Sequence, residues 1–145
     1  MKVSEAMTRD VFVANPSETL QQVAAKMAEL DAGVIPVGDN GRLVGMLTDR
    51  DIAVRAVAQG KDPQTPVSDV MSAEVKYCFE DEDVDAVQKN MGDIQLRRLP
   101  VLDREKRLVG IVSLGDIVTT TGNARKAGQA LAGISQPGGD HNQKL

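Results

Sequence analysis

Two short segments of the sequence combine a hydroxyl residue with an aspartate three positions later, Thr48 with Asp51 and Ser113 with Asp116. Each pair lies where a predicted strand leads into a predicted helix, so free backbone N–H groups and the positive end of the helix dipole face outward. Such a corner suits a phosphate or a sugar, and its aspartate can accept hydrogen bonds from both hydroxyls of a ribose. The same spacing is also typical of a capping box, in which the two side chains only close the helix end. At this point both interpretations stand.

Two adjacent cations, Arg97 and Arg98, directly precede an apolar segment that begins at Leu99. Because guanidinium groups match phosphate oxygens bidentately, the pair predicts a phosphate clamp. The alternative is a solvated pair at the end of the preceding helix, where the helix dipole favours cations. The corresponding positions in the first half of the chain are Gly33 and Val34, which supply no cation.

The remaining reactive side chains form no catalytic constellation. Cys78 lies in or after a short β-rich run and is expected to be buried packing. His141 lies in the polar tail, so we expect no relay between a nucleophile and a histidine. One cysteine and one histidine cannot make a Cys/His zinc site within the chain. Arg50, in the first turn of a predicted helix, is either a third cation for a ligand or simply exposed. We therefore predict no enzyme activity, no catalytic cofactor and no metal.

The two corners recur because the chain repeats itself. The segment Val3–Thr8 returns as Val67–Ser72, and Arg42–Gly45 returns as Arg107–Gly110 after one inserted loop residue. Gly60–Pro66 contains two prolines and is typical of a connector. We predict repeat 1 at residues 1–60, a linker at 61–66, repeat 2 at 67–122, and a short helix or disordered tail at 123–145.

Each repeat is expected to form strand, helix, strand, strand, helix. In repeat 1, Ser17 is a candidate N-cap, Gly33 a candidate helix end, and Asn40-Gly41 a hairpin turn. Repeat 2 copies the pattern with a longer turn. The expected elements are a strand at 11–13, helical spacing at 20–30, strands at 34–37 and 43–47 and a helix at 49–58, then a short strand at 75–79, helical spacing at 84–94 and strands at 99–102 and 108–112.

Length and composition limit the function. The chain has 145 residues, 41% of them hydrophobic, which suits one compact domain or two very small ones. A net charge of -4 and 2% aromatic residues argue against nucleic-acid binding. No apolar run is long enough for a transmembrane helix and no secretory signal is recognised. The single cysteine agrees with a reducing compartment, so we expect a cytoplasmic protein without membrane contact.

The duplicated motif resembles the CBS domain, of which two in tandem form a Bateman module. The first copy runs from Pro36-Val37 through Leu43-Val44-Gly45 to Asp51-Ile52, and the second from Pro100-Val101 through Leu108-Val109-Gly110 to Asp116-Ile117. The resemblance implies an α+β fold in which two β-α-β-β-α repeats pack sheet to sheet with pseudo-twofold symmetry and enclose two clefts. A flexible C-terminal tail would follow them.

The resemblance also implies which residues bind a ligand. The hydroxyls and acids of the two corners would hold a ribose, the segments before the two prolines would contact the base, and the arginines would bind phosphates. Because the repeats would exchange edges, Thr8 to Val13 should border the second cleft and Ser72 to Cys78 the first. The nucleotide-binding residues are thus expected to be Thr8, Val13, Gly33, Val34, Thr48, Arg50, Asp51, Ser72, Cys78, Arg97, Arg98, Leu99, Ser113 and Asp116. Gly115 stands where repeat 1 has Arg50, so the two clefts should bind unequally.

CBS pairs typically bind adenosine-containing ligands, namely AMP, ADP, ATP, NAD or S-adenosylmethionine. The resemblance therefore implies a non-catalytic regulatory sensor, for example of cellular energy state. It would act as a homodimer, a flat disc of four repeats, on an unidentified protein partner. The alternative function is structural: a dimerisation protein with a vestigial cleft and no ligand.

Overall fold

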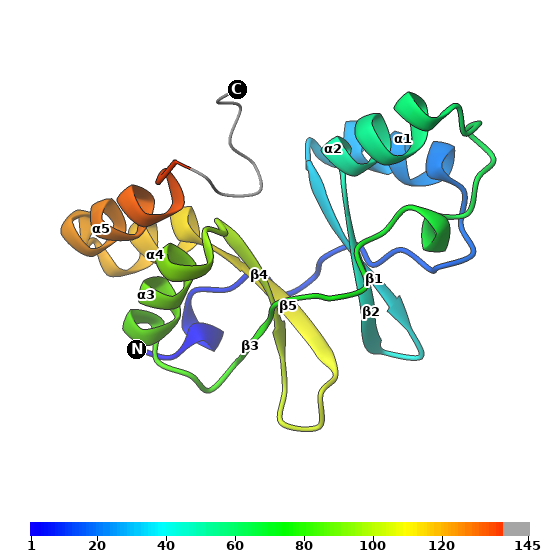
Figure 1. Cartoon of the computed structure of the whole chain (residues 1–145). Helices are drawn as coiled ribbons and strands as arrows, with labels where there is room; N and C mark the ends of the chain where they lie inside the picture. The colour runs from blue at the N-terminus through cyan, green and yellow to red at the C-terminus, as the bar shows by residue number, and fades with distance from the viewer. Residues whose placement is uncertain (138–145) are drawn as a thin grey trace. The chain divides into compact units, whose positions relative to one another are not determined.

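The computed structural model describes residues 1–137 and has the mixed α+β fold that the sequence predicts (Figure 1). Its contacts divide the chain into two compact units that cut across the repeats. Unit 1 contains Met1–Val11, Lys76–Glu105 and the chain from Val109 onward, whereas unit 2 contains Phe12–Val75 and Lys106–Leu108. The beginning of repeat 1 therefore folds with repeat 2.

Unit 2 joins an antiparallel hairpin to helices. Its elements are α1 (Leu20–Leu30), β1 (Val34–Asp39), β2 (Arg42–Thr48), α2 (Asp49–Asp51), the π-helical turn η2 (Ile52–Ala56) and the 3₁₀ turns η3 (Val57–Gln59) and η4 (Val67–Asp69). Between β1 and β2, Asn40 and Gly41 both have positive φ, 53° and 78°. These angles confirm the predicted hairpin turn, because such a turn needs residues that tolerate a left-handed backbone. The consecutive α2, η2 and η3 form the helix predicted from residue 49 to 58.

Unit 1 holds a three-stranded sheet with the strand order β3-β4-β5. Its elements are the 3₁₀ turn η1 (Val3–Glu5), β3 (Cys78–Phe79), α3 (Val84–Ile94), β4 (Arg98–Leu102), β5 (Leu108–Ser113), α4 (Leu114–Thr121) and α5 (Ala124–Ile134). The short β3 pairs with β4 in parallel, with Cys78 opposite Val101. The second hairpin turns through Lys106, whose φ is 63°.

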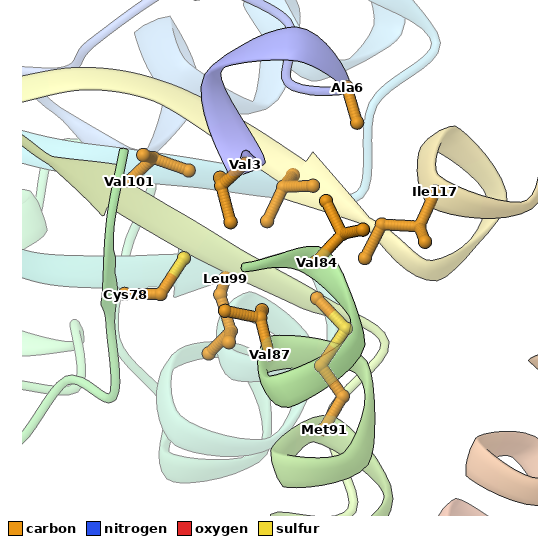
Figure 2. Close-up of a cluster of buried hydrophobic side chains, with 10 residues drawn as sticks. Val3, Ala6, Cys78, Val84, Val87, Met91, Leu99, Val101 and Ile117 are labelled. Carbon is orange, nitrogen blue, oxygen red and sulfur yellow. The ribbon is translucent and has the colours of Figure 1, made fainter. Parts of the chain in front are cut away.

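Each unit has its own apolar core, to which the predicted helical stripes contribute. From α3 come Val84, Val87 and Met91, whereas α1 contributes Leu20, Val23 and Met27. Burying a side chain of this size stabilises the fold by about 1.5–3 kcal/mol. The core of unit 1 contains Val3, Ala6, Cys78, Val84, Val87, Met91, Leu99, Val101, Val112 and Ile117 (Figure 2). The core of unit 2 contains Ala14, Leu20, Val23, Met27, Ile35, Val37, Leu47, Ala56, Val67 and Val70.

Both ends of α1 differ from the prediction. Thr19, not Ser17, is the N-cap, because Thr19 and Gln22 cap each other reciprocally while the Ser17 hydroxyl donates to Asn15. The helix ends before Gly33, at Asp31, whose φ of 53° is one that aspartate tolerates better than most residues. Leu30, the last residue of the predicted stripe, is exposed.

The first predicted strand of repeat 1, at 11–13, is absent. Instead, Ala14 alone bridges to β1, where its N–H donates to Pro36 and its carbonyl accepts from Gly38, both at 2.9 Å. Val13 leans against Gly38, where an added Cβ would lie 2.8 Å from a Val13 methyl carbon. The bulge in β1 between Val37 and Gly38 coincides with this contact.

The beginning of the predicted tail is a helix. Asn123 caps α5 by accepting a hydrogen bond from the Lys126 N–H at 3.1 Å. The helix crosses α3 so closely that a Cβ on Gly133 would lie 2.7 Å from the Gly92 carbonyl oxygen. Of the two options for residues 123–145, the helix therefore applies to Ala124–Ile134. Residues 138–145, with His141 and the end of the predicted tail, lie outside the described residues. Within residues 1–137, no helix has the length and apolar character to span a membrane.

Two candidate ligand-binding corners

The corner of unit 2 lies where β2 meets α2. The Thr48 hydroxyl accepts a hydrogen bond from the Asp51 N–H at 3.0 Å, and one Asp51 carboxylate oxygen, Oδ2, accepts from the Thr48 N–H at 3.0 Å. Leu47, directly before Thr48, is fully buried and anchors the strand end. The capping box expected as one interpretation is therefore formed.

Unit 1 repeats this geometry where β5 meets α4. Ser113 accepts from the Asp116 N–H, and Asp116 Oδ2 accepts from the Ser113 N–H, again at 3.0 Å each. The preceding Val112 is fully buried, as Leu47 is in unit 2. The two corners thus have the same two hydrogen bonds, and a fully buried residue precedes each of them.

Capping leaves part of each corner unused. The second oxygen of each carboxylate, Oδ1 of Asp51 and of Asp116, accepts no hydrogen bond from residues 1–137. The hydroxyls of Thr48 and Ser113 act as acceptors in the cap, so their O–H groups can still donate. Each half-buried corner therefore offers one fixed carboxylate oxygen and one hydroxyl donor to a ligand.

The segments before the two prolines lie next to the corners, as the sequence predicts. The Asp49 N–H donates to the Gly33 carbonyl at 3.0 Å, and the Leu114 N–H donates to the Arg97 carbonyl at 2.8 Å. A Cβ on Gly33 would lie 3.0 Å from an Asp49 carboxylate oxygen. Backbone of Gly33 and Arg97 is thereby held beside the start of a helix in each unit.

An edge segment from the other repeat borders each corner strand. Thr8 exchanges two backbone hydrogen bonds with Ile111, of 2.8 and 3.0 Å, in unit 1. In unit 2, Ser72 exchanges two with Met46, both 2.9 Å. The expected exchange of edges is thus present at Thr8 and at Ser72.

Two glycines that were not among the predicted site residues allow this exchange. A Cβ on Gly110 would lie 2.5 Å from the Thr8 carbonyl oxygen, and one on Gly45 would lie 2.5 Å from the Met71 sulfur. Both belong to the duplicated Leu-Val-Gly motif, which is the signal that could have revealed them.

The last residues of the two edge segments, Val13 and Cys78, lie in a different unit from the first residues, Thr8 and Ser72. Val13 belongs to unit 2 and contacts β1 through Gly38, whereas Thr8 belongs to unit 1. Cys78 is 2% exposed in the core of unit 1 instead of accompanying Ser72. Burial, with a smaller contribution from the charge of Glu82, raises the pKa of the Cys78 thiol to about 12. The reason for both differences is that the chain passes between units after Val11 and again after Val75.

The arginines of the predicted clamp are exposed. Arg97 and Arg98 make no side-chain hydrogen bond or ion pair within the described part of the chain, and the same holds for Arg50. Leu99, which follows the pair, is fully buried and fixes the start of β4. Both interpretations of the pair, a clamp and a solvated surface, agree with this placement.

One further cation lies near a corner. The Arg55 guanidinium donates from Nη1 to the Ser72 hydroxyl at 3.2 Å. Arg55 was not among the predicted site residues, because nothing in the pattern of a helix predicts a contact with a residue seventeen positions away. In the sequence, Arg55 is distinguished by a difference between the repeats, since repeat 2 has Thr120 at the equivalent position.

Comparison with protein-family models shows which family the chain belongs to. The CBS domain model matches residues 3–57 and 67–121, so the chain belongs to the CBS domain family and carries two such domains. It is similar to the CBS domain-containing protein YhcV of Bacillus subtilis, with 44% identity over 133 residues that cover 92% of this chain and 94% of YhcV. It is also 38% identical over 115 residues to hypoxic response protein 1 of Mycobacterium tuberculosis, covering 78% of this chain and 80% of that protein.

Solved structures of CBS pairs share the fold. Hypoxic Response Protein I with two coordinated zinc ions matches at a TM-score of 0.74 and 36% identity, covering 82% of this chain and 98% of that one. The CBS domain pair of protein MJ0100, in complex with 5′-methylthioadenosine and S-adenosyl-L-methionine, matches at a TM-score of 0.74 and 28% identity, covering 86% and 98%. Among residues 1–137 of this chain, no group of three or more His, Cys, Asp or Glu is arranged to hold a metal ion.

Proposed function

We propose that this protein is a non-catalytic regulatory module that binds an adenosine nucleotide at its two corners. The observation that carries this proposal is the duplicated aspartate, Asp51 and Asp116, which the capping box holds by one oxygen while the other stays available. Two ribose hydroxyls can donate to such a carboxylate. Hydrogen bonds to an ionised acceptor are roughly twice as strong as neutral ones.

The carboxylates of the two corners are held in place before any ligand binds. Each carboxylate is already oriented by a backbone N–H, and each corner follows a fully buried strand residue. A ligand would therefore lose little free energy to the ordering of these side chains. The adjacent backbone of Gly33 and Arg97 offers polar groups for a base.

The relatives and the arginines narrow the ligand class. The CBS pair of MJ0100 binds two adenosine-containing molecules, which supports an adenosine ligand here. Arg97 and Arg98, without partners in residues 1–137, favour ligands that carry phosphates, so AMP, ADP, ATP and NAD rank above S-adenosylmethionine. Binding would favour one arrangement of the repeats and thereby change what a partner protein contacts. We expect the protein to act in the cytoplasm as a homodimer.

A structural role without ligand is the second candidate. Both capping boxes are complete, so the residues of the corners already have a role in the folded chain. In that case dimerisation would be the function and the corners would be vestigial.

Thermal unfolding with AMP, ADP, ATP, S-adenosylmethionine and NAD separates the two candidates, with GMP and CMP as matched controls. A ligand at 100 times its Kd adds about 2.7 kcal/mol to the free energy of unfolding. We expect adenosine nucleotides to raise the unfolding temperature and GMP and CMP to leave it unchanged. In the double variant Arg97→Gln, Arg98→Gln, the shift with ATP should shrink more than the shift with adenosine. The proposal is wrong if no adenosine compound raises the unfolding temperature.

A further inference from the structure

We infer that Arg55 and Ser72 form an anion-binding pair at the corner of unit 2, so that this corner takes an adenosine ligand with a negatively charged group, such as AMP. The inference rests on the proposed function, because Asp51 and Thr48 would hold the sugar of the same ligand. It also adds to the expectation from the sequence, in which Gly33 and Val34 supplied no cation and Arg50 was a candidate.

Arg55 is a charged group without a counterion among residues 1–137. Its Nη1 donates to the Ser72 hydroxyl, a neutral acceptor, at 3.2 Å, and it makes no ion pair within residues 1–137. A guanidinium has five N–H donors and keeps its charge at any physiological pH. Since Ser72 uses only one donor, the others remain for a ligand.

The strand pairing places this cation near the ribose corner. Ser72 lies opposite Met46 on β2, and Thr48 lies two residues further along the same strand. Side chains at i and i+2 of a strand share a face, and so do paired residues on adjacent strands. Ser72 and Thr48 therefore face the same side of β2, while Leu47 faces the core. The hydrogen bond to the Ser72 hydroxyl brings the Arg55 guanidinium to this side of β2.

The helix that carries Arg55 departs from α-helical geometry at that point. In a regular α-helix, Asp51 and Arg55 would be i,i+4 neighbours and would be expected to form an ion pair. The chain instead makes a π-helical turn over Ile52–Ala56, and no Asp51–Arg55 ion pair occurs in the described structure. Asp51 thereby keeps a free oxygen and Arg55 extends to Ser72. Single π-helical turns inside helices occur frequently at functional sites.

Unit 1 lacks this arrangement. The helix after its corner, α4, is α-helical from Leu114 to Thr121, and Thr120 occupies the position equivalent to Arg55. Its candidate cations, Arg97 and Arg98, precede β4 instead. The two corners therefore receive positive charge from different elements, so each would hold the anionic group of its ligand in a different position.

The test measures binding of AMP and of adenosine by isothermal titration in protein whose unit 1 corner carries Asp116→Asn. Adding Arg55→Gln should weaken AMP about ten-fold or more, because a hydrogen bond to a charged group is lost, and should leave adenosine unchanged. Arg55→Lys should restore part of the AMP affinity. Arg125→Gln, which removes an exposed arginine of α5, is the matched control and should change neither affinity.

Each outcome decides the inference. Equal AMP affinity with and without Arg55→Gln overturns the anion-binding pair and leaves the proposed function intact. Equal losses of AMP and adenosine also overturn it, because Arg55 would then not act on the anionic group. If no adenosine compound binds even the unsubstituted protein, the proposed function fails and this inference fails with it. Should Arg55→Gln not fold, Arg55→Lys and Ser72→Ala decide by the same comparison of AMP with adenosine.

Discussion

The substitution Asp116→Ala separates the two roles of a corner aspartate. In the folded protein, Asp116 Oδ2 accepts one hydrogen bond from the Ser113 N–H, while the Ser113 hydroxyl still caps α4 through the Asp116 N–H. Alanine removes only the first of these two bonds. Because this N–H is partly exposed and water can replace the carboxylate, the free energy of unfolding should fall by about 1 kcal/mol. The unfolding temperature should fall by about 4 °C for a chain of this size.

The same substitution removes the acceptor of the ribose hydroxyls. Losing hydrogen bonds to a charged acceptor costs about 1.5–3 kcal/mol each, so the affinity of the unit 1 corner for AMP should fall at least ten-fold. Asp116→Asn is the matched control, since an amide oxygen can still accept from Ser113. We expect it to keep most of the stability and to lose affinity.

Calorimetric titration with AMP measures the affinity, and unfolding in urea measures the free energy of unfolding. The reasoning is refuted if Asp116→Ala binds AMP as tightly as the unsubstituted protein while its stability drops by several kcal/mol. That result would mean that the aspartate serves the helix end alone, and the second candidate function would be favoured.

Two further predictions concern the edge segment and the thiol. Gly110→Ala would place a Cβ 2.5 Å from the Thr8 carbonyl oxygen, so both hydrogen bonds between Thr8 and Ile111 should break and the unfolding midpoint in urea should fall. Gly128→Ala, whose Cβ would meet nothing and which lies inside α5, should instead keep or raise the midpoint. A midpoint of Gly110→Ala equal to that of the unsubstituted protein would contradict the close approach. Burial raises the pKa of the Cys78 thiol from its usual 9.0 to about 12, so the folded state holds this proton more tightly than the unfolded state. The resulting stabilisation is present below pH 9 and is lost as the pH rises toward 12. Unfolding titrations between pH 8 and 11 on the parent and on Cys78→Ala should show a steeper loss in the parent, and parallel curves would count against a buried thiol.

Local chemistry in the sequence determined most elements. Asn40 and Gly41 specify a hairpin because few other residues tolerate two consecutive positive φ angles. The apolar spacing of α3 predicted its buried face, and the hydroxyl-to-aspartate spacing predicted both corners. Where neighbouring residues could serve one role, the prediction failed: Ser17 was expected as the N-cap of α1, and Thr19 is the residue that caps it.

Only the tertiary structure decided which segments meet. A repeated sequence does not say that Thr8 pairs with β5 or Ser72 with β2, because such pairing depends on the path of the chain between units. The contact of Arg55 with Ser72 required both that pairing and a π-helical turn, neither of which has a periodicity that can be read from residue types. Side-chain patterns record which face of an element is buried, whereas the partner of that face is set by long-range packing of the whole chain.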